Sequence, residues 1–274
     1  MTNEAFQQAI INRIHEKGIA LPTLPDVAFK VKSIAENPNS TASDLASVVS
    51  RDPAISARLI QVANSPLYRG VQPIENLNQI ITRIGMRAVS NLVVSLALQQ
   101  LFQSKSQALQ QRMRRHWEFS TQVATLATML ARKHRHIDPE QAMLAGLLQG
   151  IGALPVIAIA EDIPKLQAAP ALLDELILEL QPRLGVQIIS AWNFPEHFTT
   201  VVRECGNLQR THEGPPDYTD VVTVAILQAR SIDSGAADEN WIGVPAAEKL
   251  GVDPTSNPLD DELEETFRTL TEGL

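Results

Sequence analysis

The stretch Gly146-Leu147-Leu148-Gln149-Gly150-Ile151-Gly152-Ala153-Leu154 decides the fold of this chain. It lies within residues 142–160, an uncharged and mostly apolar segment whose length is close to that of a bilayer span. Three glycines and Pro155 interrupt the segment, and Gln149 lies in its middle, so one continuous helix is disfavoured. The segment therefore predicts two short buried helices that meet at a turn, in a soluble protein rather than across a membrane.

Start signals elsewhere in the sequence predict helices and almost no strands. Asp52 with Pro53, and Asp138 with Pro139, each combine a capping side chain with a proline that suits the first helical turn. Gln141 is placed to return a hydrogen bond to the Asp138 cap. The fold class predicted is all-α. Apolar residues recur at helical spacing over residues 55–63, 77–84, 89–101, 123–131, 172–180, 221–229 and 259–270.

The composition of the chain predicts three parts. The polar stretch 103–111, with two serines and four glutamines, is the expected junction between two helical groups, the second beginning near Met113. We expect an N-terminal helical bundle over residues 1–104, a second bundle over 105–230, and a C-terminal extension over 231–274 that ends in an amphipathic helix. With 274 residues, 44% of them hydrophobic, the chain has ample apolar content for such a core.

Charge and cysteine content narrow the functional classes. A net charge of -8 argues against a nucleic-acid partner, because such binding depends on cations that neutralise phosphates. We interpret the basic runs 112–116 and 133–136 as solvated helix surface rather than as a phosphate site. The single cysteine, Cys205, excludes an internal disulfide and predicts an inert buried thiol. The amino terminus shows no secretory signal, so a cytoplasmic protein is expected.

The glycine-rich stretch resembles the Gly-Leu-Leu-His-Asp-Ile-Gly turn of the HD superfamily of metal-dependent phosphohydrolases. Gln149 and Gly150 stand where that turn has its metal-binding histidine and aspartate. An amide and a bare glycine supply neither an imidazole nor a carboxylate to a divalent cation. The resemblance thus implies an enzyme's frame without its metal site, and we assign no catalytic residue, metal or cofactor. The degenerate ligand positions that it implies are Phe119, Gln149, Gly150, Gln181, Glu204 and Cys205.

The first third of the chain resembles a narrower family. The motifs Leu21-Pro22-Thr23-Leu24-Pro25, Arg51-Asp52-Pro53-Ala54 and Ala63-Asn64-Ser65-Pro66-Leu67-Tyr68 follow in order. From about residue 19 to about residue 206 the chain is similar to the HDOD domain, an HD-related output domain of bacterial signalling proteins. This resemblance implies an N-terminal helical bundle packed with an HD-like helical bundle, and a regulatory rather than catalytic role. We interpret the motif residues as structural, since such polar side chains bond the backbone at helix ends: Asp52, Pro53, Asn64, Ser65 and Tyr68.

The remaining histidines do not indicate a metal site. The spacing of His134, His136 and Asp138 does not place them on one helix face, so we interpret Asp138 as a helix cap preceded by two surface histidines. His197 and His212 are isolated in the sequence, which is more typical of surface or core residues than of ligands.

The leading hypothesis is a non-catalytic regulatory or interaction module whose partner is an unidentified protein of a signalling pathway, with no membrane attachment. One alternative is a divergent HD-type metal-dependent phosphohydrolase, in which His116 supplies a ligand after a shift in register from Phe119. The other is a nucleotide-sensing domain that binds a nucleotide or another small molecule in the residual pocket without hydrolysis. Arg114 and Arg115 would then contribute to phosphate binding.

Overall fold

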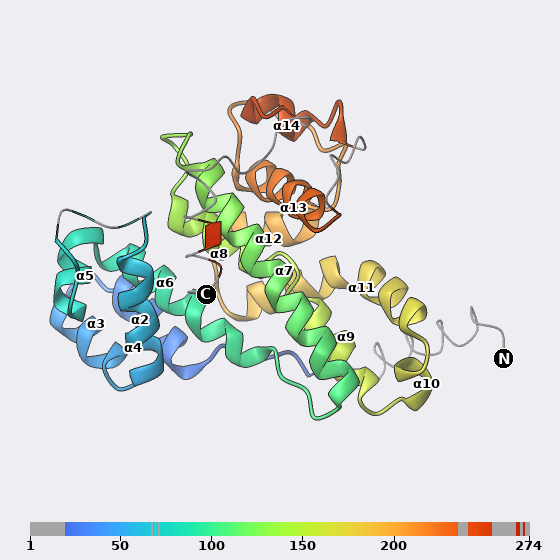
Figure 1. Ribbon diagram of the computed structural model, residues 1–274, viewed down its shortest axis with the longest axis horizontal. Helices are drawn as coiled ribbons and strands as arrows, with labels where there is room; N and C mark the ends of the chain where they lie inside the picture. The colour runs from blue at the N-terminus through green and yellow to red at the C-terminus, as the bar shows by residue number, and fades with distance from the viewer. Residues whose placement is uncertain are drawn as a thin grey trace.

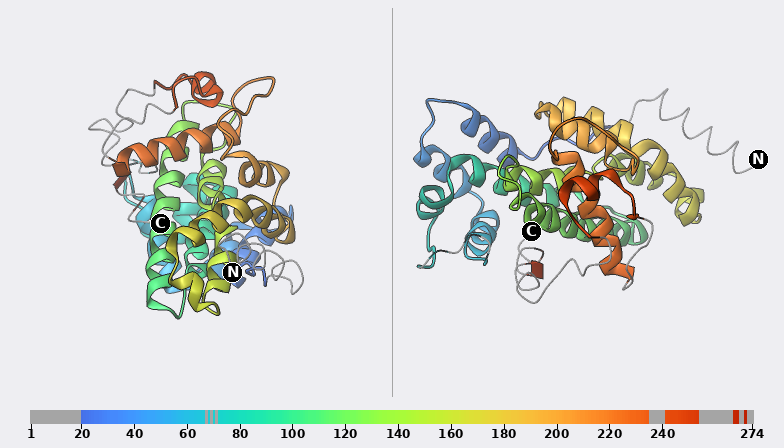
Figure 2. Two further views of the ribbon diagram at one scale, coloured as in Figure 1. Left: turned by 90° about the vertical axis from the view of Figure 1, so that its right-hand side faces the viewer. Right: turned by 90° about the horizontal axis from the view of Figure 1, so that it is seen from above.

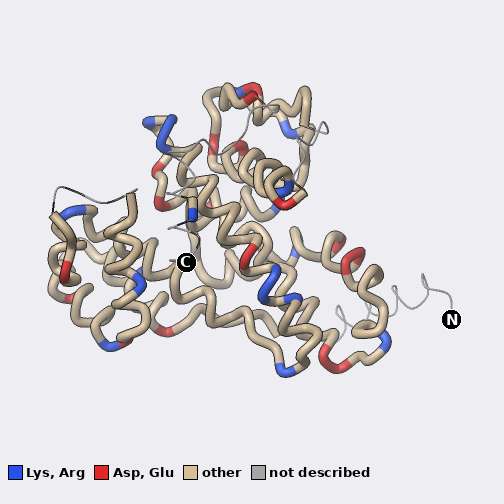
Figure 3. Tube along the Cα trace, viewed as in Figure 1, with Lys and Arg blue, Asp and Glu red and all other residues tan. Residues whose placement is uncertain are grey.

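The computed structural model describes residues 20–66, 68, 70, 72–234, 241–253, 267, 268 and 271. Every regular element within these residues is a helix, so the predicted all-α class is confirmed. Figure 1 shows helices α2 to α6 grouped at one end of the molecule, and the view from above in Figure 2 shows the same separation along the long axis. Lys and Arg positions are interspersed with Asp and Glu positions along both groups (Figure 3).

The first group contains the helices before residue 99. Asp52 caps α4 as predicted: its Oδ1 accepts hydrogen bonds from the backbone N–H of Ala54 at 3.1 Å and of Ile55 at 3.0 Å, and Pro53 occupies the first turn. Gly85, with φ of 89°, joins α5 to α6 in a conformation that favours glycine. The helices are α2 (Asp26–Glu36), α3 (Ala42–Val49), α4 (Pro53–Ala63), α5 (Leu77–Ile84) and α6 (Met86–Leu98).

The second group is built around α7, which packs against both α8 and α13. The first group joins it mainly through contacts of α6 with α8, and the buried side chains form one continuous cluster across both groups. The helices and the 3-10 turn η1 that precedes them are η1 (Gln99–Leu101), α7 (Gln107–Ala131), α8 (Pro139–Leu148), α9 (Ala153–Ala160), α10 (Pro164–Gln167), α11 (Pro170–Ala191), α12 (Glu196–Glu204), α13 (Tyr218–Ser234) and α14 (Pro245–Leu250).

The uncharged segment forms two helices, as its glycines predict. Helix α8 ends at Leu148, and α9 begins at Ala153 after a four-residue turn. Taken together, residues 139–160 are long and apolar enough to cross a membrane, but 89% of their most apolar window is buried inside the fold. The segment therefore serves as core: it brings α8 against α7 and α9 against α11.

Two glycines of this segment permit close helix packing. A Cβ atom at Gly146 would lie 2.6 Å from the Cα of Ala124 on α7, which is closer than real Cβ contacts. A Cβ at Gly152 would lie 2.0 Å from the carbonyl oxygen of Gln181 and 2.6 Å from the N of Gly185, both on α11. The turn between α8 and α9 is therefore in direct backbone contact with α11.

Two sequence predictions about helix ends need correction, and one helix was missed. The polar stretch 103–111 is not wholly a junction, because α7 already begins at Gln107; glutamine is a good helix former, and Gln110 Oε1 accepts from the backbone N–H of Ser104 at 2.6 Å. Gln141 returns no side-chain bond to the cap, although Asp138 caps α8 as expected. Helix α14, which starts at Pro245, was not predicted. Most of the expected helix over 259–270 lies outside the described residues, and the three-part division of the chain stays a proposal.

Candidate functional site

The predicted ligand pair Gln149-Gly150 opens the turn between α8 and α9. Helix α8 carries the turn because Asp138 caps its first turn and apolar side chains bury it on nearly every side. Gln149 is 6% exposed, and none of the hydrogen bonds among the described residues involves its side-chain amide. A buried amide without a protein partner normally bonds water or a ligand, because leaving it unbonded is costly.

His116 on α7 occupies the space beside Gly150. A Cβ atom at Gly150 would lie 2.6 Å from Nε2 of His116 and 2.7 Å from its Cε1. The same Nε2 lies 2.9 Å from the carbonyl oxygen of Gly150. A carbonyl oxygen can only accept, so Nε2 carries the proton and donates it. In this arrangement position 150 has no room for any side chain, and therefore none for a ligand carboxylate.

The ring of His116 is held in place by its neighbours. It stacks on Phe102 with ring centroids 5.9 Å apart and an angle of 28° between the planes, and Phe102 also contacts Trp117 at 4.9 Å. Burial lowers the pKa of His116, and the positive charge of Arg112 lowers it further, against the hydrogen bond to Gly150, which raises it. His116 is therefore a neutral hydrogen-bond donor at neutral pH.

The other predicted ligand positions offer little to a cation. Phe119 is a half-buried hydrocarbon packed against the core. The backbone of Gln181 is pressed against Gly152, and its partly buried side-chain amide has no bond to another described residue. Both oxygens of Glu204 are engaged, Oε1 with Arg203 at 3.1 Å and Oε2 with Arg210 at 2.8 Å. Burial raises the pKa of the Cys205 thiol to about 12, so it is not a thiolate.

The donor set at the turn does not suit a divalent metal. Catalytic zinc sites use three imidazole, carboxylate or thiolate ligands, and magnesium needs oxygen ligands that include carboxylates. Here the side chains at positions 149 and 181 are amides, and those at 119 and 150 are a phenyl ring and a hydrogen atom. His116 is the imidazole at Gly150, and its Nε2 proton is used by the backbone.

A cluster of side chains of the kinds that bind metal ions, which the sequence did not predict, lies at the start of α13. Candidate ligand atoms of His212, Asp217 and Asp220 all lie within 4.8 Å of one another. Two protein cations already serve these groups. Arg210 bonds Asp217 at 2.6 Å and Asp220 at 3.1 Å, and Lys249 Nζ lies 3.0 Å from Nε2 of His212. We interpret the cluster as a structural ion-pair network. His212 is isolated in the sequence, and it meets Asp220 of α13 and Lys249 of α14 only in the folded chain.

The motif residues after α4 close a loop. The side-chain amide of Asn64 donates to the carbonyl oxygens of Ile60 at 3.0 Å and Ile74 at 2.8 Å, and its Oδ1 accepts from the N–H of Ile74 at 2.7 Å. Tyr68 is buried, with the guanidinium of Arg132 5.4 Å from its ring centroid. These contacts support a structural role for Asn64 and Tyr68. For Ser65 that role stays a prediction, because its buried hydroxyl has no hydrogen-bond partner among the described residues.

The remaining predicted groups are found away from the turn. Arg114 lines a cavity of about 460 Å³ together with Trp117 and Thr121, on a different face of α7 from His116, and its nearest acidic partner is Glu118 at 3.9 Å. His136 bonds the carbonyl oxygen of Pro216 at 2.8 Å. Arg114 therefore does not support nucleotide binding at the turn beside Gly150.

Comparison with known proteins identifies the architecture. The family model described as "HDOD domain" matches residues 21–207. A crystal structure from Shewanella amazonensis SB2B, provisionally named a metal-dependent phosphohydrolase, is similar with a TM-score of 0.86 and 28% identity, covering 99% of this chain and 98% of that one. An HDOD domain protein of unknown function from Geobacter sulfurreducens has the same fold, with a TM-score of 0.69 and 18% identity over 97% of each chain.

A curated relative is longer than this chain. An uncharacterised protein of Treponema pallidum (strain Nichols) is 24% identical over 227 residues, which are 78% of this chain and 43% of that protein. The chain thus spans less than half the length of the curated relative that it matches.

Proposed function

The chain belongs to the HDOD domain family, which is related to metal-dependent phosphohydrolases, and from this premise we propose that it is a non-catalytic regulatory module of bacterial signal transduction. The observation that carries the proposal is the imidazole of His116 against Gly150, in the space that a ligand carboxylate would need. In this proposal the module acts by binding a partner and not by hydrolysing a substrate. Its expected partner is a protein of a signalling pathway in the cytoplasm.

Metal content and hydrolysis test the proposal on the full chain. Purified protein is expected to hold no stoichiometric divalent metal by elemental analysis. With added manganese it is expected to cleave cyclic dinucleotides and a generic phosphodiester no faster than a protein-free control. One or two tightly held metals per chain, or hydrolysis above that control, would overturn it.

A metal-dependent phosphohydrolase is the second candidate. It is favoured by the name of the Shewanella amazonensis relative, and His116 would be its only imidazole at this turn among the described residues. The two candidates differ in what His116→Ala does to any measured hydrolysis. An enzyme that uses this histidine would lose its rate in His116→Ala and keep it in the matched variant His136→Ala, at an exposed histidine on another part of the chain.

A further inference from the structure

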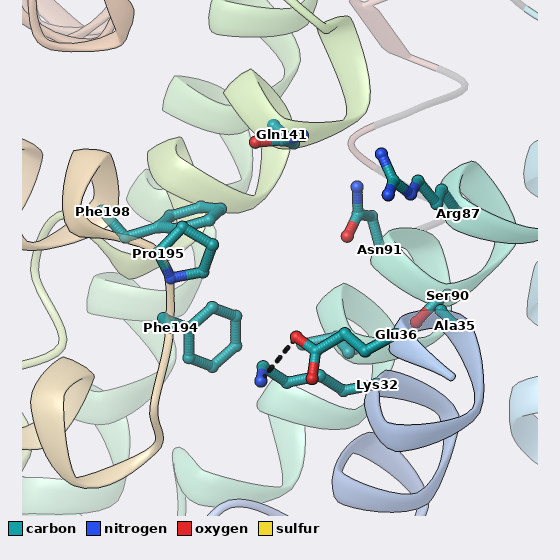
Figure 4. Close-up of a pocket in the computed structure, with 11 residues that line it drawn as sticks. Lys32, Ala35, Glu36, Arg87, Ser90, Asn91, Gln141, Phe194, Pro195 and Phe198 are labelled. Atoms are coloured by element: carbon teal, nitrogen blue, oxygen red, sulfur yellow. Dashed lines mark ion pairs between the residues drawn. The ribbon is translucent and has the colours of Figure 1, made fainter. Parts of the chain in front are cut away.

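A cleft lies between the two helical groups (Figure 4). Its volume is about 270 Å³, just below the range of about 300–1,000 Å³ that is typical of small-molecule sites. One wall comes from α2 and α6, and the facing wall comes from α8, the connection between α11 and α12, and the first turn of α12. The residues that the argument uses are Lys32, Arg87, Asn91, Gln141, Phe194 and Phe198.

The wall at the start of α12 is apolar and held firmly. Phe198 is 3% exposed, and its ring meets that of Phe194 edge to face at 5.3 Å. The connection turns at Asn193, whose φ of 54° lies in the left-handed region, and the following N–H bonds the carbonyl oxygen of Ile189 at 3.2 Å. A wall fixed in this way offers apolar contact to an aromatic ligand, mainly through the half-buried ring of Phe194, without a large ordering cost.

Three polar side chains that line the cleft, two on the α6 wall and one on α8, make no bond to another described residue. Arg87 and Asn91 are four residues apart on one face of α6, and Gln141 points toward the cleft from α8 (Figure 4). Among the described residues, none of these three side chains has a hydrogen-bond or ion-pair partner. Gln141 is the residue whose predicted bond to the helix cap is not made, which leaves its amide available here.

The charges in the cleft favour an anion. Lys32, whose side chain is 14% exposed, pairs with Glu36 at 2.7 Å and lies 5.5 Å from the ring centroid of Phe194, so these two charges largely neutralise each other. Arg87 is exposed and unpaired among the described residues, and it is left as the net positive group. A guanidinium in this position suits a phosphate, which it can bind through two parallel hydrogen bonds.

We propose that this cleft binds a nucleoside monophosphate. The base lies against the half-buried ring of Phe194, the amides of Asn91 and Gln141 bond its edge, and Arg87 pairs with the phosphate. Amide side chains suit the edge of a base because each offers both a donor and an acceptor. The small volume excludes ligands of dinucleotide size. Because the two walls belong to different helical groups, the bound ligand would hold α6 and α12 in one relative position.

Calorimetry on the full chain tests the proposal with adenosine, guanosine, cytidine and uridine monophosphates, the corresponding nucleosides, and inorganic phosphate. At least one monophosphate is expected to bind with a Kd of about 1–100 μM. Its nucleoside is expected to bind at least tenfold more weakly, and inorganic phosphate not to compete at equal concentration. Absence of heat from every monophosphate at millimolar concentration, or displacement by phosphate alone, would overturn it.

Matched variants locate the site. Asn91→Leu and Gln141→Leu are each expected to weaken the monophosphate at least tenfold, whereas Gln209→Leu, at an exposed amide far along the chain, is expected to leave it unchanged. Arg87→Ala is expected to weaken the monophosphate and not the nucleoside, with Arg135→Ala as its control. Binding that survives both amide substitutions would place the ligand elsewhere and reject the proposal. Neither result alters the proposed non-catalytic function, which depends on metal content and hydrolysis.

Discussion

The imidazole ring of His116 occupies the space that a side chain at position 150 would need. The imidazole Nε2 lies 2.9 Å from the Gly150 carbonyl oxygen, and a Cβ at position 150 would come within 2.6 Å of the same nitrogen. Glycine at this position is therefore explained by packing: the ring of a residue 34 positions earlier fills the site.

The first prediction tests this exclusion. Gly150→Ala is expected to lower the free energy of unfolding by about 1–3 kcal/mol, because the new methyl group must displace a stacked ring. In a His116→Ala background the same change is expected to cost less, with a coupling energy above about 0.5 kcal/mol. Urea unfolding of the wild type, both single variants and the double variant measures this coupling. Strictly additive effects would contradict the contact.

The second prediction concerns pH. Burial lowers the pKa of His116 below its usual 6.5, so the folded chain binds this proton less tightly than the unfolded chain does. The contribution of His116 is therefore fully present above pH 6.5 and is lost as the pH falls through 6.5 toward the folded pKa, by up to about 1.4 kcal/mol per pH unit.

Denaturation between pH 5 and 8 measures this effect, roughly spanning the range in which histidine titrates. His134 and His197, whose pKa values are also lowered, mainly by burial, contribute in the same direction. Comparison with His116→Gln, which keeps a donor and does not titrate, isolates the His116 share. His136→Gln, at an exposed histidine, serves as the control. Equal slopes for the wild type and His116→Gln would show that His116 does not titrate with unfolding.

The third prediction concerns the loop held by Asn64. Asn64→Asp retains an acceptor for the N–H of Ile74 but removes the donor to the carbonyl oxygens of Ile60 and Ile74. The expected loss of unfolding free energy is about 2–3 kcal/mol, because partly buried carbonyls lose their partner and face a carboxylate. Asn78→Asp, on an exposed face of α5, is expected to change stability by less than about 0.5 kcal/mol. Comparable losses from both substitutions would show that the three hydrogen bonds of the Asn64 side chain do not stabilise this loop.

The fourth prediction concerns Arg210 and the carboxylates around it. Arg210→Met leaves Asp220, which is 1% exposed, without its guanidinium partner, and is expected to cost about 3–5 kcal/mol. Adding Asp220→Asn removes the buried charge and is expected to recover part of the loss. Arg203→Met, at a side chain that is 48% exposed, is expected to change stability by less than about 1 kcal/mol. Thermal unfolding that ranks the two arginine variants equally would contradict a structural network.

Local signals in the sequence predicted the all-α class, several helix starts and one helix break. Asp52 and Asp138 predicted two helix starts, because a cap is formed between residues two or three positions apart. The glycines between Gly146 and Gly152 predicted the break between α8 and α9 for the same reason: backbone geometry at a turn depends on the residues of that turn. The family resemblance added the prediction that the turn at Gln149 and Gly150 is the candidate site.

Tertiary structure alone decided what each side chain at that turn meets. Helical periodicity tells which face of α7 carries His116, but the rotation and crossing of α7 over α8 determine that this ring ends at Gly150. The same holds for Gln141, whose sequence neighbours suggested a cap and whose packing turns it toward the cleft with Asn91. Local chemistry thus determined the helices, whereas contacts between residues distant in sequence, set by how the helices pack, determined the sites.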